Sequence, residues 1–152
     1  MANTTFTGPV RSQNGFQDIS IDSTTGAVTV NATFGSATSI ASLTTTGNVT
    51  VGGAIIGSTQ NLSGSGAVNL TSGTTKITTA AGAAALTLAN GTDGQIKMLV
   101  MVVDGGGNAT LTPTTATGFT TLTFGDAGDS VILQYFTTLG WMLIANNGAV
   151  VA

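Results

Sequence analysis

Residues 95–113, QIKMLVMVVDGGGNATLTP, decide the fold class that the sequence predicts. Side chains alternate between the two faces of a strand, so residues 96–103 fall into two sets. One face carries Ile96, Met98, Val100 and Val102, and the other carries Lys97, Leu99, Met101 and Val103. Because both sets are apolar beyond the first residues, this strand is expected to be covered on both sides. Residues 105–107, GGG, are predicted to form a hairpin turn, since a phosphate-binding loop would need a following helix rather than the strand NATLTP.

The rest of residues 82–152 has the same texture of apolar strands separated by turns. ALTLA, FTTLTF, SVILQYF and GWMLIAN are bounded by NGTDG, GDAGD and TLG, with a turn about every ten residues. This spacing predicts an antiparallel β-sandwich or barrel that holds the principal core. Trp141, the only Trp, follows Gly140 and is expected to close one end of this domain as a large apolar anchor.

Residues 19–81 carry a repeated pattern of short strands rich in Gly and Thr. The units GAVTV, GNVTV and GAVNL begin at Gly26, Gly47 and Gly66, so they share G-x-V-x-[VL] at spacings of 21 and 19 residues. Such recurrence is typical of a stacked or solenoidal β architecture, although a biased composition alone can also generate it. Each unit offers two small apolar side chains, so we expect three chains to wind around one axis; a flat stack on the C-terminal domain is the alternative. The expected trimer core comprises Val28, Val30, Val49, Val51, Val68 and Leu70.

Residues 1–18 have neither helical nor alternating periodicity and are expected to form an extended N-terminal arm. A frayed terminus is the alternative. Arg11 is the only Arg of the chain, and Arg is enriched at protein interfaces. The residues expected to anchor this arm on a larger assembly are Phe6, Pro9, Val10, Arg11 and Phe16.

The composition argues against an enzyme. The chain has no His, no Cys and no Glu, so neither a zinc site nor a nucleophile with a His base can be built from it. Asp126 and Asp129 come nearest to a catalytic carboxylate pair, but their Gly-rich loop predicts solvated turn residues. Calcium needs six or more oxygen ligands, for which this pair, or Asp104 beside residues 105–107, is weak evidence. We expect no catalytic residue, no metal and no cofactor.

The charge balance and the hydropathy indicate protein partners. Three cationic side chains and six acidic ones give a net charge of −3 and a pI near 4.1, without the cationic cluster that nucleic acid requires. A mean hydropathy of +0.40 with 6% charged residues is high for a soluble monomer and indicates a homo-oligomer. The apolar runs are too short to cross a bilayer, and MANTTFTGPV lacks the pattern of a secretory signal. We therefore expect no membrane contact, and synthesis in a host cytoplasm without a signal peptide.

The two lysines lie in segments with strand-like alternation. Lys76 and Lys97 are flanked by apolar residues, a pattern typical of a lysine that discourages unwanted pairing at a sheet edge. The alternative is an ion pair with an Asp of a neighbouring chain.

Three segments resemble structural proteins of tailed bacteriophages. Residues 38–58, TSIASLTTTGNVTVGGAIIGS, are similar to the G-N-[LV]-T-V-x-G units of tail-fibre and tail-spike shafts, in which three chains wind together. Residues 87–151 resemble a small β domain at the ends of phage head-decoration and fibre proteins, and TGPVRSQNGF, residues 7–16, resembles the start of structural proteins from marine tailed phages. The resemblance covers most of the chain and implies a trimer fixed to a capsid or a tail.

These observations lead to one principal expectation and two alternatives. Because the chain is short for a complete receptor-binding fibre, the resemblance implies a homotrimeric decoration (cement) protein on the virion, bound to the major capsid protein or to other virion proteins on the capsid surface rather than the tail. The first alternative is a short tail or head fibre, an adhesin that binds host polysaccharide through Tyr135 and Trp141. The second, an enzyme that degrades the cell envelope, is disfavoured by the residue inventory.

Overall fold

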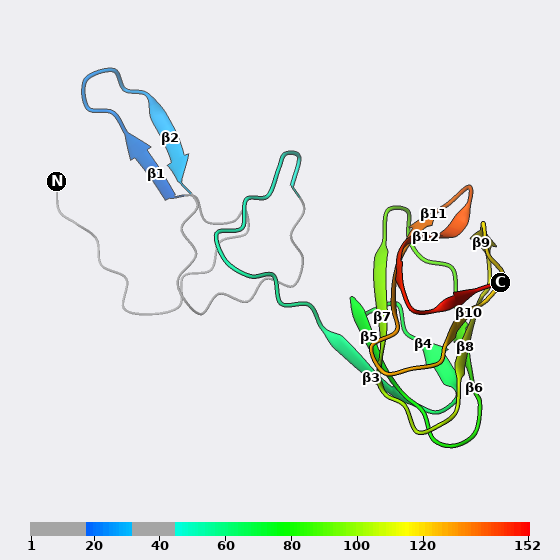
Figure 1. The fold of residues 1–152 in the computed structure, drawn as a ribbon. Coiled ribbons are helices and arrows are strands. Elements are labelled where there is room, and N and C mark those ends of the chain that lie inside the picture. The colour runs from blue at the N-terminus through cyan, green and yellow to red at the C-terminus, as the bar shows by residue number, and fades with distance from the viewer. Residues whose placement is uncertain (1–17, 32–44) are drawn as a thin grey trace. The chain divides into compact units, whose positions relative to one another are not determined.

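The computed structural model describes residues 18–31 and 45–152, and every regular element in these two stretches is a β-strand. The chain divides into two compact units, Met1–Thr50 and Val51–Ala152. In the first unit, β1 (Asp18–Ile21) and β2 (Val28–Asn31) form an antiparallel hairpin, drawn in blue in Figure 1. The expectation of an all-β protein is confirmed for the described residues.

The turn of this hairpin is held by one carboxylate. Asp22 Oδ1 accepts hydrogen bonds from the backbone N–H groups of Thr24 at 2.7 Å and Thr25 at 2.9 Å. These donors stabilise the ionised form, so the pKa of Asp22 is lowered from its usual value. Gly26 completes the turn with a φ of +70°, a conformation that residues with a side chain rarely adopt.

The second unit, Val51–Ala152, consists of two sheets around one core (Figure 1). The six-stranded sheet has the order β3 (Thr59–Ser63), β5 (Thr74–Thr78), β7 (Ile96–Val103), β11 (Ser130–Phe136), β12 (Gly140–Asn147) and β9 (Ala116–Thr117). The five-stranded sheet has the order β13 (Val150–Val151), β10 (Leu122–Phe124), β8 (Ala109–Pro113), β6 (Ala84–Leu88) and β4 (Gly66–Val68).

From β3 to β8 the chain forms a solenoid. Successive strands alternate between the two sheets, and each strand pairs in parallel with the strand one coil further along. Gly66 in β4 is therefore the partner of Leu86 in β6, which is the partner of Leu111 in β8. Only the later strands add antiparallel pairs, as where β11 joins β7 and β10 joins β8. The antiparallel sandwich or barrel expected for residues 82–152 is wrong for β6, β7 and β8, because their connections carry the chain from one sheet to the other. Antiparallel pairing is found in this span only where β10, β11, β12 and β13 take part.

The core is built from ladders of equivalent residues in successive coils. Leu62, Ile77 and Met101 are aligned across β3, β5 and β7, and Leu86 and Leu111 are aligned across β6 and β8. A fully buried side chain of this size contributes about 1.5–3 kcal/mol. The fully buried aliphatic and aromatic residues of the core include Ile77, Leu86, Leu88, Leu99, Met101, Leu111, Leu122, Phe124, Leu133 and Trp141.

The glycine run at 105–107 fits the turn of one coil onto the turn of the previous coil. A Cβ atom on Gly105 would lie 2.3 Å from the backbone oxygen of Thr79, and one on Gly107 would lie 2.1 Å from that of Gly82. A side chain at either position would therefore collide with the main chain. The expectation of a hairpin turn here is wrong, because β7 and β8 lie in different sheets.

The repeat that the sequence shows coincides with the solenoid only in its third unit. GAVNL supplies β4, and the partner of Gly66 in the next coil is Leu86, twenty residues later, which is close to the spacings of 21 and 19. GNVTV, residues 47–51, is not a strand, contrary to expectation, and the first unit contributes β2 to the hairpin.

The boundary expected between residues 81 and 82 falls inside the hydrogen-bonded sheets. β5, which precedes that point, pairs with β7, which follows it, and the second compact unit already begins at Val51. The strands β3, β4 and β5 therefore belong to the same core as the later strands.

Candidate interaction surface

The acidic residues that come nearest to a catalytic or metal site act in turns. Asp129 is buried, and its Oδ2 accepts hydrogen bonds from the backbone N–H of Gly125 at 2.8 Å and of Asp126 at 3.1 Å. Asp126 itself is exposed. Asp104 Oδ1 accepts the N–H of Gly106 at 2.7 Å. Each of these contacts is ordinary turn chemistry. In residues 18–31 and 45–152, no three acidic residues gather into a group that could hold a metal ion.

Neither lysine guards a sheet edge, so that expectation is wrong. β5 lies between β3 and β7, and β7 lies between β5 and β11. Lys76 is exposed on β5, whereas Lys97 is fully buried on β7. Lys97 Nζ donates a hydrogen bond to the backbone oxygen of Ser72 at 2.6 Å. Burial lowers the pKa of Lys97 to about 8, because water no longer solvates its charge.

The aromatic pair considered for glycan binding is part of the core. Trp141 is fully buried and Tyr135 is 7% exposed. Their rings meet edge to face at a centroid distance of 5.3 Å, and Trp141 Nε1 donates to the backbone oxygen of Ala89 at 2.9 Å. The expectation that Trp141 is a buried anchor is confirmed, but neither ring is available to stack on a sugar.

A wide hollow of about 490 Å³ lies at the loop of residues 90–95 and offers no such ring either. Leu70 and Thr71 complete its lining, and Asp93 is its only charged residue. Asp93 Oδ1 already accepts hydrogen bonds from the N–H and the hydroxyl of Thr137, which tie this loop to the turn between β11 and β12. The one carboxylate of the hollow therefore stabilises the fold of this loop.

The predicted partner-binding residues are placed as follows. Phe6, Pro9, Val10, Arg11 and Phe16 lie outside the described residues. Val28 and Val30 lie in β2, whose backbone alone is described. Val49 and Val51 are exposed, at 57% and 48%. Val68 is buried and Leu70 is half-buried, and both pack in the core of their own chain, where no neighbouring copy is needed to cover them.

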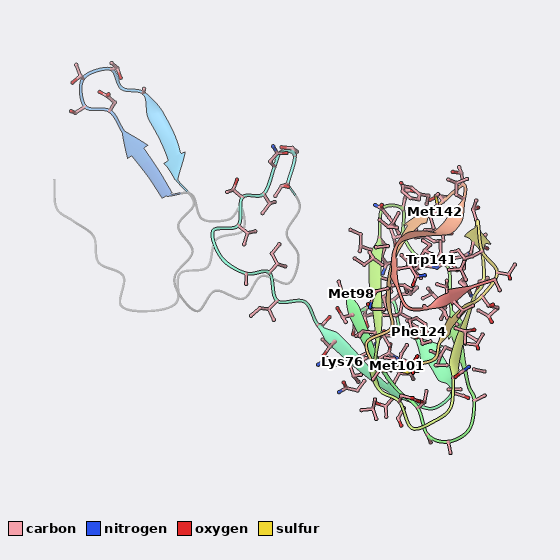
Figure 2. The ribbon with its side chains drawn as sticks, in the orientation of Figure 1. Lys76, Met98, Met101, Phe124, Trp141 and Met142 are labelled. Carbon is pink, nitrogen blue, oxygen red and sulfur yellow. The ribbon has the colours of Figure 1, made fainter. Side chains whose placement is uncertain are left out.

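The outer face of the six-stranded sheet exposes several large aliphatic side chains. From β7 it presents Ile96, Met98 and Val102, which are 60%, 40% and 45% exposed. Ile144 of β12 is 55% exposed, and Ile132, the partner of Met98, and Met142 are half-buried; Figure 2 labels Met98 and Met142. Only the face of β7 that carries Lys97, Leu99 and Met101 is covered by the chain itself, and Val103 is exposed. The expectation that β7 is covered on both sides is thus wrong for the single chain.

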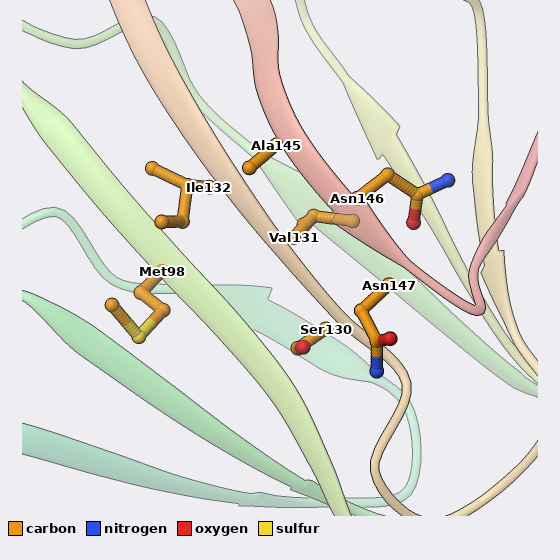
Figure 3. A pocket seen from close by; sticks show the side chains of 7 residues that line it. All are labelled: Met98, Ser130, Val131, Ile132, Ala145, Asn146 and Asn147. Carbon is orange, nitrogen blue, oxygen red and sulfur yellow. The ribbon is translucent and has the colours of Figure 1, made fainter.

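A shallow apolar hollow of about 180 Å³ lies on this face. Its floor follows one row across three strands, because Met98 is the partner of Ile132, which is the partner of Ala145 (Figure 3). Asn146 and Asn147 form its polar margin. The pairing register shifts between Ile132 and Leu133, so Ile144 is the extra residue of a β-bulge beside the hollow.

Sequence reasoning missed both this surface and the burial of Lys97. The alternation in residues 96–103 gave the two sets of side chains correctly, and the structure adds which set faces the core. If one of the two faces of β7 carried mainly polar residues, the sequence would have identified that face as the outer one. Both faces carry mainly apolar residues, so the sequence could not distinguish them.

No family model matches the chain, and no curated protein matches it. Within the stretches that the structure describes, there is no helix of the length and apolarity needed to span a membrane.

Proposed function

We propose that this protein is a structural component of a tailed-phage virion: a homotrimer that decorates the outside of the capsid and stabilises the shell. The observation that carries this proposal is the set of exposed aliphatic side chains on the outer faces of β7 and β12, where Ile96 and Ile144 are each more than half exposed. Contiguous apolar surface of this kind marks a protein interface. Asp104 and Asp129, two of the acidic residues considered for a metal or for catalysis, accept backbone hydrogen bonds within turns.

Stabilisation of the shell follows from mass action. A protein that binds the assembled shell and not the dissociated subunit raises the apparent stability of the shell. The N-terminal arm, with Arg11 and its apolar neighbours, supplies the contact with the major capsid protein in this proposal, and Val51–Ala152 supplies the folded body.

The test is binding to purified particles. The full chain and a variant lacking residues 1–17 are mixed with particles stripped of this protein, and occupancy and the temperature of shell disruption are measured. We expect the full chain to bind and to raise that temperature, and the truncated variant to bind less. Undiminished binding of the truncated variant would rule out the arm as the anchor.

Copy number separates decoration from the adhesin alternative. A copy number comparable to that of the major capsid protein supports decoration, whereas the small number set by the symmetry of a tail would identify a fibre. The burial of Tyr135 and Trp141 leaves the adhesin without the two aromatic residues expected to stack on a sugar.

A further inference from the structure

We infer that the bond between Asn90 and Gly91 is a site of spontaneous deamidation, at which the chain converts Asn90 into aspartate and isoaspartate. The reactants are the side-chain amide of Asn90, the backbone nitrogen of Gly91 and water. The inference goes beyond the proposed virion role and does not depend on it, because it concerns the chemistry of the chain itself. It predicts how the end of the domain that holds Trp141 changes as the protein ages.

The reaction has two steps. In the first, the nitrogen of Gly91 loses its proton and attacks Cγ of Asn90, which closes a five-membered succinimide ring and releases the side-chain nitrogen as ammonia. In the second, water adds to one of the two ring carbonyls and breaks its bond to the nitrogen. Cleavage at the side-chain carbonyl gives aspartate, and cleavage at the main-chain carbonyl gives isoaspartate. Water is the only co-reactant, and no oxidant or reductant is needed.

The structure leaves the reacting groups of this site free. Asn90 is exposed, and it follows β6 in a stretch without regular structure. Its amide makes no hydrogen bond to the residues that the structure describes, so rotation of the side chain breaks no contact. The N–H of Gly91 has no backbone acceptor in the same part of the chain. Because Gly91 has no side chain, nothing on it obstructs the approach of Asn90 Cγ to its nitrogen.

The pair Asn147–Gly148, the other Asn–Gly pair in residues 18–31 and 45–152, is restrained instead. Asn147 is the last residue of β12 and is paired with Ser130 of β11. Its Nδ2 donates a hydrogen bond to the backbone oxygen of Gly128 at 3.1 Å. The N–H of Gly148 is as free of backbone acceptors as that of Gly91, so the difference lies in the asparagine. Asn147 must break its contacts before it reacts, and we therefore expect Asn90 to react faster.

The residues on both sides of Asn90 support the Trp141 anchor. The backbone oxygen of Ala89 accepts the hydrogen bond from Trp141 Nε1 at 2.9 Å. A Cβ atom on Gly91 would lie 3.0 Å from the Trp141 ring and 3.1 Å from Tyr135 Cβ, so Gly91 is packed closely against this aromatic pair. Isoaspartate adds one atom to the main chain between these two fixed points. Its formation therefore displaces Ala89 or Gly91 and weakens the packing around Trp141.

Both products also add a negative charge to the loop of residues 90–95. The new carboxylate lies three positions from Asp93, which ties the loop to Thr137 through two hydrogen bonds. Repulsion between exposed carboxylates is screened by water and salt. The longer main chain of isoaspartate is therefore expected to destabilise the domain more than the added charge does.

Trypsin isolates the site for measurement. Cleavage after Lys76 and Lys97 releases residues 77–97, a peptide whose only Asn is Asn90, whereas Asn147 falls in the following peptide. The purified full chain is kept in warm, mildly alkaline buffer, and samples are digested and analysed by mass spectrometry over time. We expect deamidation of Asn90 to be about tenfold faster than that of Asn147, a factor that corresponds to about 1.4 kcal/mol of restraint. An isoaspartyl methyltransferase assay on the 77–97 peptide detects the isoaspartate.

Incubation in urea is the control for the structural argument. In the unfolded chain neither asparagine is restrained, so the two sites should react at similar rates. If Asn90 of the folded chain reacts no faster than Asn147, the inference is overturned. A preference for Asn90 that is as large in urea as in buffer would overturn the role assigned to the hydrogen bond and the strand pairing of Asn147.

The variant Asn90→Gln tests the consequence for stability. It keeps a side-chain amide at an exposed position, but Gln would have to close a six-membered ring, which forms far more slowly. We expect the urea midpoint of the wild type to fall as isoaspartate accumulates and that of N90Q to stay constant over the same period. A wild-type midpoint that does not change while isoaspartate accumulates would overturn the predicted weakening of the Trp141 anchor.

Discussion

At the β11–β12 end of the domain the interior is sealed by large apolar side chains, whereas at the β3–β4 end it is bridged by hydrogen bonds. Trp141 and Tyr135 pack together at the first end. At the second end, Gln60 Nε2 donates to the backbone oxygen of Ala67, and Gln60 Oε1 accepts from the N–H of Asn69 and the hydroxyl of Thr75, each at 2.9 Å. Leu62 is only half-buried there. Local stability in a solenoid depends on each coil and its neighbours, so the β3–β4 coil is expected to open first.

Removal of the apolar anchor should have the largest effect. Trp141→Ala leaves a cavity between the sheets and removes the partner of Ala89 and of the Tyr135 ring, so we expect a loss of about 4 kcal/mol in the free energy of unfolding. Urea unfolding followed by circular dichroism measures this loss. Trp141→Phe, which keeps an aromatic ring, should lose clearly less. An equal loss of unfolding free energy in the two variants would show that the stability of this end does not depend on an aromatic ring at position 141.

The second-largest loss of stability is expected where the turn of residues 105–107 packs on the turn of the previous coil. A Cβ atom on Gly107 would lie 2.1 Å from the oxygen of Gly82, so Gly107→Ala must displace main chain and should cost about 3 kcal/mol. Gly73→Ala is the matched control, because a Cβ atom at Gly73 meets nothing within 4 Å. Similar midpoints for the two variants in urea would contradict the close fit of the turns.

Lys97 is a charged side chain that is fully buried in the core, and its effect on the free energy of unfolding depends on pH. Its pKa is about 8 in the folded chain against 10.5 for a free lysine, so between these values the unfolded chain binds more protons. Stability should therefore rise with pH across this window, and the full penalty applies below pH 8. With allowance for solvent screening, the rise is about 2 kcal/mol.

Lys97→Met tests this assignment. The variant should be more stable than the wild type at pH 7 and should lose the rise, because its side chain has no charge to bury. Unfolding midpoints from pH 7 to pH 10 measure both slopes, and a slope that persists in the variant would assign the rise to another group.

The smallest change in the free energy of unfolding is expected in the β3–β4 coil, where Gln60 makes its hydrogen bonds. Gln60→Ala leaves the backbone groups of Ala67 and Asn69 without their side-chain partner, at a cost of about 1 kcal/mol. Hydrogen exchange should accelerate in β3 and β4 more than in β11. Asn61→Ala, at an exposed neighbouring position, should leave the exchange unchanged. Uniform acceleration in both variants would show that the two ends unfold together.

The sequence predicted most strand positions but not their partners. Alternation located β4, β7, β11 and β12 correctly, because the period of two is a property of the strand alone. A Gly-rich turn gives the same signal whether the chain returns along its own sheet or crosses to the other, so residues 105–107 did not distinguish a hairpin from a coil. The parallel pairing of β7 with β5 is fixed only by the stacking of whole coils.

The candidate site was predictable to a smaller extent. Hydropathy indicated an interface, but both faces of β7 are apolar and the outer one could not be chosen from its sequence. The burial of Lys97 was equally hidden, because an amine within a strand indicates an exposed position unless the face toward the core is known. The burial of Trp141 was predicted correctly, because a side chain with so large an apolar surface is stable mainly when the core covers it.

The position of β3 and β4 at the ends of their sheets gives the domain a modular length. A duplicated coil of about 20 residues inserted before Thr59 would extend both sheets in register, by about 4.8 Å for each added strand, and would leave the packing around Trp141 untouched. Variation in the height of such a domain can therefore arise by gain or loss of whole coils, without redesign of its opposite end.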